Sequence, residues 1–145
     1  MNYAAIKKFD IANGPGVRVS LFVSGCRHKC KNCFNSEAWD FEYGEKFTDQ
    51  TLNELLEAVS LDYIEGFSLL GGEPFEPENQ LELLKLLRLI KEKLPNKSVW
   101  CYTGFLYDSQ LLSGKVGDGE TVKEMLKNID VLVDGKFVEE LKSPD

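Results

Sequence analysis

Four short apolar runs, separated by longer segments, limit what this 145-residue chain can fold into. The runs are residues 17–23, 67–70, 98–102 and 131–133. Each is rich in β-branched or other apolar residues and is bounded by polar or turn-forming residues, which is typical of buried strands. The alternation with longer segments indicates crossover connections, which allow the strands to lie parallel in one sheet.

The longer segments carry helical periodicity. Thr48 can cap a first helix, and in both the first and second segments apolar residues recur on one face at helical spacing. The two apolar stripes are Leu52, Leu55, Leu56 and Val59, and then Leu83, Leu87, Ile90 and Leu94. Residues 119–128 predict a shorter third helix.

The order of these elements predicts an α/β fold with an open parallel sheet of about four or five strands. That number is too small to close an eight-stranded barrel, so we expect an open partial (β/α) barrel. Ligands of such sheets bind outside the carboxyl ends of the strands. Residues 24–26 and the pair Gly71 and Gly72 both fall at predicted strand ends.

Composition narrows the classes of function. The 43% hydrophobic content suits one core, so we expect a single domain over residues 1–145. A net charge of −7, with no block of Lys or Arg, argues against a nucleic-acid partner. No apolar run is long enough to span a bilayer and residues 1–10 do not resemble a signal peptide, so we expect no membrane partner and a cytoplasmic location.

Three of the four cysteines lie close together. Cys26, Cys30 and Cys33 are separated by three and two residues, directly after the first predicted strand. In a reducing compartment such spacing favours metal ligation over disulfides. A 4Fe-4S cluster usually takes four cysteines, so three ligands in one loop would leave one iron open to a substrate.

Two other interpretations of the cysteines belong to a different class of protein. One is a structural zinc module with His28 or Cys101 as the fourth ligand. The other is an electron carrier, although a carrier normally surrounds its cluster with four cysteines. His28 is also typical of a solvated loop residue. Cys101 lies in an apolar run and is typical of a buried small hydrophobe.

The cysteine spacing, followed by Phe34, resembles the signature of the radical S-adenosylmethionine superfamily. Other segments resemble, in order and spacing, the activators of anaerobic ribonucleoside-triphosphate reductases within it: residues 13–18, 21–26, 33–35, 71–74, 100–104 and 130–137. Glu73 stands where close relatives often have Asp, a change that keeps the charge. Relatives continue past Asp145 into a polar segment, so we expect that the C-terminal tail is truncated here.

The resemblance implies a radical SAM type of partial barrel, and a 4Fe-4S cluster and S-adenosylmethionine as cofactors. It implies that the open iron chelates the amino and carboxylate groups of S-adenosylmethionine, that reductive cleavage yields a 5′-deoxyadenosyl radical, and that this radical forms a glycyl radical on the reductase. The implied partners are that reductase and a flavodoxin- or ferredoxin-type reductant. No general acid is expected, because hydrogen-atom abstraction needs no proton shuttle.

The resemblance also implies roles for individual residues. Cys26, Cys30 and Cys33 would ligate the cluster, and Asn32, Cys33 and Phe34 would lie along the adenine. Gly71, Gly72 and Glu73 would lie near the methionine amino group, and Thr103 would form part of the cofactor rim.

Plainer interpretations stay open for several of these residues. Phe34 could belong to the core, and Gly71 to Glu73 and Thr103 could form ordinary turns. Residues 13–18 could form a loop on the substrate side, but they are also typical of a turn in which Arg18 pairs with an acid. Two related functions also remain open: activation of another glycyl radical enzyme, or synthesis of a deazaguanine precursor.

Overall fold

The computed structural model describes residues 1–27, 39–113, 116–134 and 139–142. In chain order its elements are β1 (Asn2–Asp10), β2 (Arg18–Val23), β3 (Glu45–Lys46), α1 (Asp49–Val59), β4 (Gly66–Gly71), α2 (Pro77–Lys93), β5 (Ser98–Tyr102), the π-helical turn η2 (Tyr107–Leu111), α3 (Gly119–Lys127), β6 (Val131–Asp134) and β7 (Glu139–Lys142).

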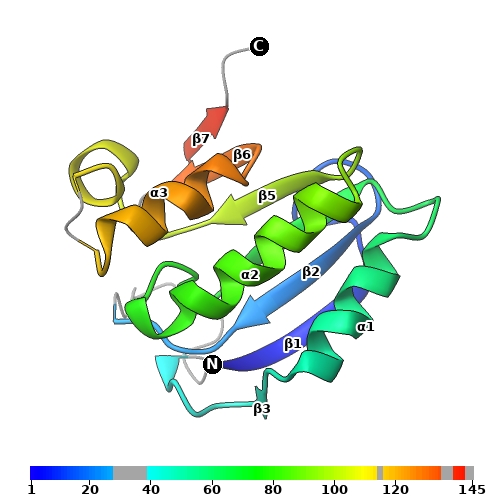
Figure 1. Ribbon diagram of the computed structural model, residues 1–145, viewed down its shortest axis with the longest axis horizontal. Coiled ribbons are helices and arrows are strands. Elements are labelled where there is room, and N and C mark those ends of the chain that lie inside the picture. The colour runs from blue at the N-terminus through cyan, green and yellow to red at the C-terminus, as the bar shows by residue number, and fades with distance from the viewer. Residues whose placement is uncertain (28–38, 114–115, 135–138, 143–145) are drawn as a thin grey trace.

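One mixed sheet organises these elements (Figure 1). Its order is β3-β1-β2-β4-β5-β6-β7; β2, β4, β5 and β6 are parallel, and the other three strands join antiparallel. Helices α1, α2 and α3 lie over the same face of the sheet. The α/β class, the four predicted strands and the three predicted helices are confirmed. The prediction of an all-parallel sheet with fewer strands is wrong.

Strand β1 escaped prediction because its pairing with β2 is irregular. The register shifts between Tyr3 and Ala5 and again between Lys7 and Asp10. Each shift interrupts the two-residue alternation by which a strand is recognised. The exposed residues near the end of β1 weaken the apolar signal further.

The core lies between the sheet and the helices. Val19, Leu21 and Val23 of β2 are fully buried, and their alternation places them on the helix-covered face. Leu55 of α1 and Leu87 of α2 are among the buried residues that pack against them.

Local sequence explains where the helices start. Thr48 and Thr51 form a reciprocal capping box at α1, as the predicted cap at Thr48 requires. Helix α2 begins with Pro77, whose fixed φ and missing amide suit the first helical position. Helix α2 therefore begins six residues before Leu83, the first residue of its apolar stripe.

On the helix-free face, the side chain of Arg18 is fully buried and crosses the beginnings of β4 and β5. All five of its hydrogen bonds go to neutral oxygens, so the expectation that it pairs with an acid is wrong. Its acceptors are the Ser68 hydroxyl (2.8 Å), the Ser98 hydroxyl (3.0 Å) and the carbonyls of Pro15 (3.1 Å), Phe67 (3.1 Å) and Ser98 (2.7 Å). Burial lowers the pKa of Arg18, but a guanidinium remains charged in proteins.

Residues 11–17 connect β1 to β2 and lie against this part of the sheet. The Ser68 hydroxyl donates to the Asn13 carbonyl at 2.6 Å. The buried Asp10 carboxylate accepts from the Ser20 hydroxyl (2.6 Å), the Asn13 side-chain amide (2.7 Å) and the Ala12 amide (2.9 Å). The connection is therefore fixed at the amino ends of the parallel strands, opposite the end that carries Cys26.

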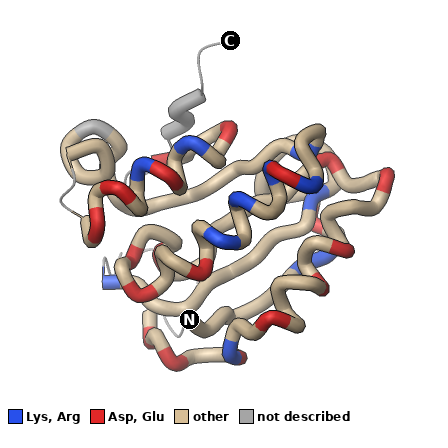
Figure 2. Tube along the Cα trace, viewed as in Figure 1, with Lys and Arg blue, Asp and Glu red and all other residues tan. Residues whose placement is uncertain are grey.

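Charged side chains are distributed over the helices. Figure 2 shows Lys and Arg interspersed with Asp and Glu along them. None of the helices in the described parts of the chain combines the length and the hydropathy that a bilayer crossing requires.

Replacing Arg18 should destabilise the protein strongly. Arg18→Met removes five hydrogen bonds and leaves buried acceptors without a donor, so the free energy of unfolding should fall by about 3–5 kcal/mol. Urea unfolding of the metal-free protein measures it. As a control, Arg88→Met removes an exposed ion pair with Glu124 and should cost about 0–1 kcal/mol. Equal losses for the two variants would contradict the assigned role of Arg18.

Asp10 should make stability depend on pH in the acid range. Burial alone would raise the pKa of Asp10, but the bonds from Ser20, Asn13 and Ala12 lower it below its ordinary value of 3.8. The stability that Asp10 contributes is therefore present above about pH 4 and is lost as the pH falls through the folded pKa. The difference in unfolding free energy between wild type and Asp10→Asn should shrink between about pH 5 and pH 3. A difference in unfolding free energy that stays constant with pH would argue against this role of Asp10.

Candidate functional site

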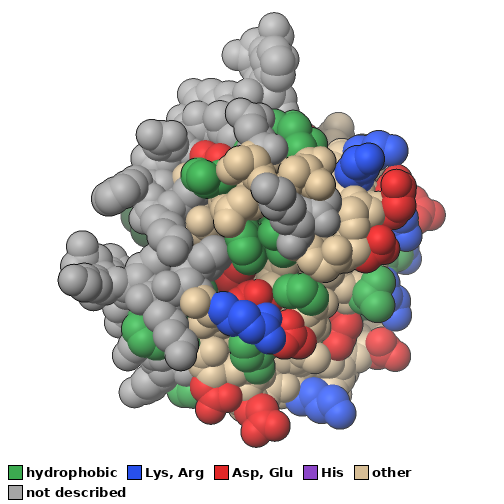
Figure 3. Space-filling view, turned by 90° about the vertical axis from the view of Figure 1, so that its left-hand side faces the viewer, with side chains coloured by type: hydrophobic (Ala, Val, Ile, Leu, Met, Phe, Trp, Pro, Cys, Tyr) green, Lys and Arg blue, Asp and Glu red, His purple; other side chains and the backbone are tan. Residues whose placement is uncertain are grey.

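The carboxyl ends of β2, β4 and β5 bring three separate motifs to one end of the sheet. Cys26 follows β2, Gly71 ends β4 opposite Val23, and Thr103 follows β5. Figure 3 looks onto this end, where hydrophobic side chains and charges of both signs are mixed on the described surface. The predicted residues Cys30, Asn32, Cys33 and Phe34 lie outside the described residues, as does His28.

Main-chain hydrogen bonds join the cysteine segment to the glycine pair. The Gly72 amide donates to the Val23 carbonyl and the Glu73 amide donates to the Gly25 carbonyl, both at 2.8 Å. The Cys26 amide donates to the Trp39 carbonyl at 3.2 Å. These bonds hold Cys26 next to residues 71–73. Cys26 is only 7% exposed.

Two glycines of the site have conformations that other residues rarely adopt. Gly71 has a φ of +116°, and a Cβ there would lie 2.4 Å from the Val23 nitrogen. Gly25 has a φ of +100°, and a Cβ there would lie 2.2 Å from the Phe41 ring. Both positions require glycine because neighbouring protein atoms fill the space. This reason is independent of the approach of a cofactor.

Glu73 is fully buried and joins the end of β4 to the end of β5. One carboxylate oxygen accepts from the Phe75 amide (2.8 Å) and the Thr103 hydroxyl (2.7 Å), and the other from the Gly104 amide (2.6 Å). The Thr103 hydroxyl also accepts from the Phe105 amide at 3.1 Å. The two predicted residues are thus in direct contact, and the Thr103 hydroxyl holds the Glu73 carboxylate in place.

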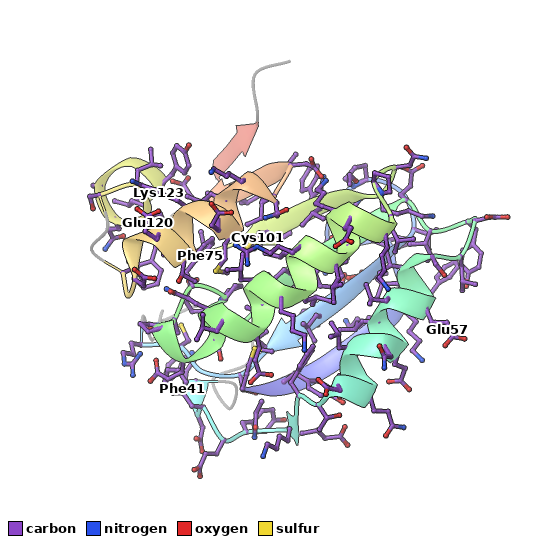
Figure 4. The ribbon with its side chains drawn as sticks, viewed as in Figure 1. Phe41, Glu57, Phe75, Cys101, Glu120 and Lys123 are labelled. Atoms are coloured by element: carbon purple, nitrogen blue, oxygen red, sulfur yellow. The ribbon has the colours of Figure 1, made fainter. Side chains whose placement is uncertain are left out.

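Cys101 belongs to the core and not to this site. Its side chain is fully buried on β5, and burial raises the pKa of its thiol well above the ordinary value, with a further contribution from Glu73. Figure 4 shows Cys101 in the middle of the molecule, and it and Phe75 both belong to the core. Its predicted role as a buried small hydrophobe is confirmed.

Sequence reasoning missed the side chains that hold the start of the cysteine segment. Glu76 accepts from the Arg27 amide (2.6 Å) and from its guanidinium (2.9 Å), and the Asn79 side chain donates to the Ser24 carbonyl (3.1 Å). The Arg27 guanidinium also lies 4.7 Å from the centre of the Phe41 ring. Hydrogen bonds to Glu78 and Glu76 raise the pKa of Arg27 above its ordinary value. The sequence indicated only a turn over residues 74–77, and no pattern in it pointed to these contacts.

The described residues fit one corner of a cysteine-ligated cluster. Cys26 carries a thiol outside any disulfide, and cysteine thiolates are the usual ligands of iron–sulfur clusters. Within the described ranges no three His, Cys, Asp or Glu side chains gather as a metal site. A cluster at Cys26 therefore needs the cysteines that follow it.

The Thr103 hydroxyl should contribute to stability through Glu73. Thr103→Val leaves the buried carboxylate and the Phe105 amide one partner short, so the free energy of unfolding should fall by about 1–3 kcal/mol. Thr103→Ser keeps the hydroxyl and serves as the control. Urea unfolding of the metal-free protein tests the pair, and a valine variant as stable as the serine variant would contradict the role.

Comparison with known proteins identifies relatives over almost the whole chain. Residues 12–145 match the family described as "4Fe-4S single cluster domain". A relative in Enterobacteria phage T4 is 41% identical, with 97% of this chain and 84% of the relative covered; one in Escherichia coli (strain K12) is 40% identical, with 99% and 90% covered. A third, in Vibrio cholerae serotype O1, is 37% identical, with 99% and 89% covered. All three are named anaerobic ribonucleoside-triphosphate reductase-activating proteins.

The resemblance seen in the sequence motifs is thereby confirmed over almost the whole chain. The predicted 4Fe-4S cluster agrees with the description of the matched family. This chain belongs to the family of anaerobic ribonucleoside-triphosphate reductase-activating proteins.

Proposed function

We propose that this chain is an activating enzyme that generates a glycyl radical on an anaerobic ribonucleoside-triphosphate reductase. The observation that carries the proposal is the convergence of Cys26, Gly71 to Glu73 and Thr103 at one end of the sheet. These residues come from motifs far apart in the sequence. Membership of the activator family supports the same assignment.

The cluster ligands in this proposal are Cys26, Cys30 and Cys33, with Asn32, Cys33 and Phe34 beside the adenine of S-adenosylmethionine. When bound, the cluster and cofactor supply one-electron chemistry: reductive cleavage of a carbon–sulfur bond, which leads to removal of a hydrogen atom from a glycine Cα of the reductase. The reductant is a flavodoxin- or ferredoxin-type protein.

The chain's own residues position these groups. Gly71, Gly72 and Glu73 provide the surface for the methionine amino group, and a buried carboxylate favours a cation beside it. Thr103 supports this surface by holding Glu73. The hydrogen bonds between the ends of β2 and β4 keep Cys26 at a set place relative to that surface.

The finer fold assignment is also part of the proposal. Strands β2, β4, β5 and β6, with helices on one face, correspond to part of a radical SAM type (β/α) barrel, in one domain over residues 1–145. Their parallel order and the location of the candidate site at their carboxyl ends support this correspondence.

Anaerobic reconstitution with iron and sulfide tests the function. The reduced protein should give an electron paramagnetic resonance signal of a 4Fe-4S cluster that changes when S-adenosylmethionine is added. Mixing with the reductase should then produce 5′-deoxyadenosine and a glycyl radical signal. Cys26→Ala should lose all of these signals.

Cys101→Ala is the matched control, since Cys101 is equally a buried cysteine but lies in the core. It should retain the cluster. A colourless protein that binds zinc would contradict the proposal in favour of a metal module. A cluster that responds to S-adenosylmethionine but activates only a different glycyl radical enzyme would contradict the assigned partner.

A further inference from the structure

Glu76 combines deep burial with an exposed partner. Its residue is 2% exposed, whereas the side chain of Arg27 is 59% exposed. One carboxylate oxygen of Glu76 accepts from the Arg27 amide at 2.6 Å, and the other accepts from the guanidinium at 2.9 Å. Glu76 therefore binds both the main chain and the side chain of the residue that directly follows Cys26.

Helix capping does not explain this carboxylate. Glu76 occupies the N-cap position of α2, where the side-chain oxygen of a Ser, Thr, Asp or Asn ordinarily accepts from amides of the first helical turn. The Glu76 side chain makes no such capping bond. Burying a carboxylate is costly, so its contacts with Arg27 are the interactions that compensate for the burial.

The main chain on both sides of Cys26 is anchored in the same way. Four consecutive residues, 24 to 27, each have at least one main-chain group that is hydrogen-bonded to a partner distant in sequence. The bonds are Asn79 Nδ2 to Ser24 O (3.1 Å), Glu73 N to Gly25 O (2.8 Å), Cys26 N to Trp39 O (3.2 Å) and Arg27 N to Glu76 Oε2 (2.6 Å). Glu76 supplies the one charged acceptor among these four bonds.

We infer that Glu76 is a positioning residue for the cluster ligand Cys26, acting through the Arg27 amide. The inference rests on the proposed function, because it assumes that Cys26 ligates a 4Fe-4S cluster. Groups that orient metal ligands from behind typically change metal affinity by about 10- to 100-fold when they are removed. A buried negative charge beside a ligand also favours the oxidised cluster, because reduction adds a further negative charge.

Glu76→Gln and Glu78→Gln form a matched pair that tests the inference. Both remove one acidic group that binds the Arg27 guanidinium, but Glu78 is about half exposed and has no bond to the Arg27 amide. The full-length reconstituted proteins are compared by the rate at which a chelator removes iron, and by the midpoint potential of the cluster from anaerobic redox titration. Unfolding of each metal-free protein gives the purely structural effect.

Glu76→Gln should lose iron about tenfold faster than wild type or more, and its midpoint potential should become less negative. Glu78→Gln should resemble wild type in both measurements. Glu76→Asp is a second variant. It keeps the negative charge, but its shorter side chain places the carboxylate farther from the Arg27 amide. It should also lose iron faster than Glu78→Gln, while its potential stays nearer to that of wild type.

Two results would overturn the inference, and they are distinguishable. If Glu76→Gln and Glu76→Asp change only the unfolding of the metal-free protein, Glu76 is a structural residue and the proposed function is unaffected. If wild type itself forms no 4Fe-4S cluster under conditions in which it is folded, the proposed function fails and the inference fails with it.

Discussion

The parallel pairing of β2 with β4 is the constraint on which the site depends. It runs from Arg18 opposite Gly66 to Val23 opposite Gly71, and it continues past both strand ends through the amides of Gly72 and Glu73. A slip of one residue in this register would turn the apolar side chains of β2 away from the helices. It would also separate Cys26 from the glycine pair, so one pairing fixes both the core and the site.

Each end of the parallel strands contains a buried charged side chain that binds neutral groups among the described residues. At the amino ends Arg18 binds hydroxyl and carbonyl oxygens, and at the carboxyl ends Glu73 accepts from two amides and a hydroxyl. Each side chain spans two strands that adjoin in the sheet. Because an unpaired buried charge is costly, each charge favours only those arrangements that bring its partners together. The sheet is thereby fixed at both ends.

Most of the regular structure could be predicted because its signals are local. The apolar stripe of α2 lies within a few helical turns, and the β-branched run of β2 lies within one strand. Both were predicted from the sequence. Strand β1 was not, because two register shifts interrupt its alternation. Of the candidate site, the cysteine spacing and the Gly-Gly-Glu sequence were visible, whereas Glu76 lay in what the sequence indicated to be a turn. Its partner Arg27 lies 49 residues away, and no pattern in the sequence connects the two.

The sequence by itself determined the α/β class and the order of the parallel strands and helices along the chain. It also determined the family and the motifs that carry the candidate chemistry. Each of these depends on residue types at short spacing. Only the tertiary structure decided that Glu73 contacts Thr103, that Glu76 and Asn79 hold the start of the cysteine segment, and that Arg18 binds neutral oxygens. Such contacts depend on which strands become neighbours and in what register. Hydrogen bonds form between groups that folding brings together, and the separation of two residues along the chain does not show whether they will meet.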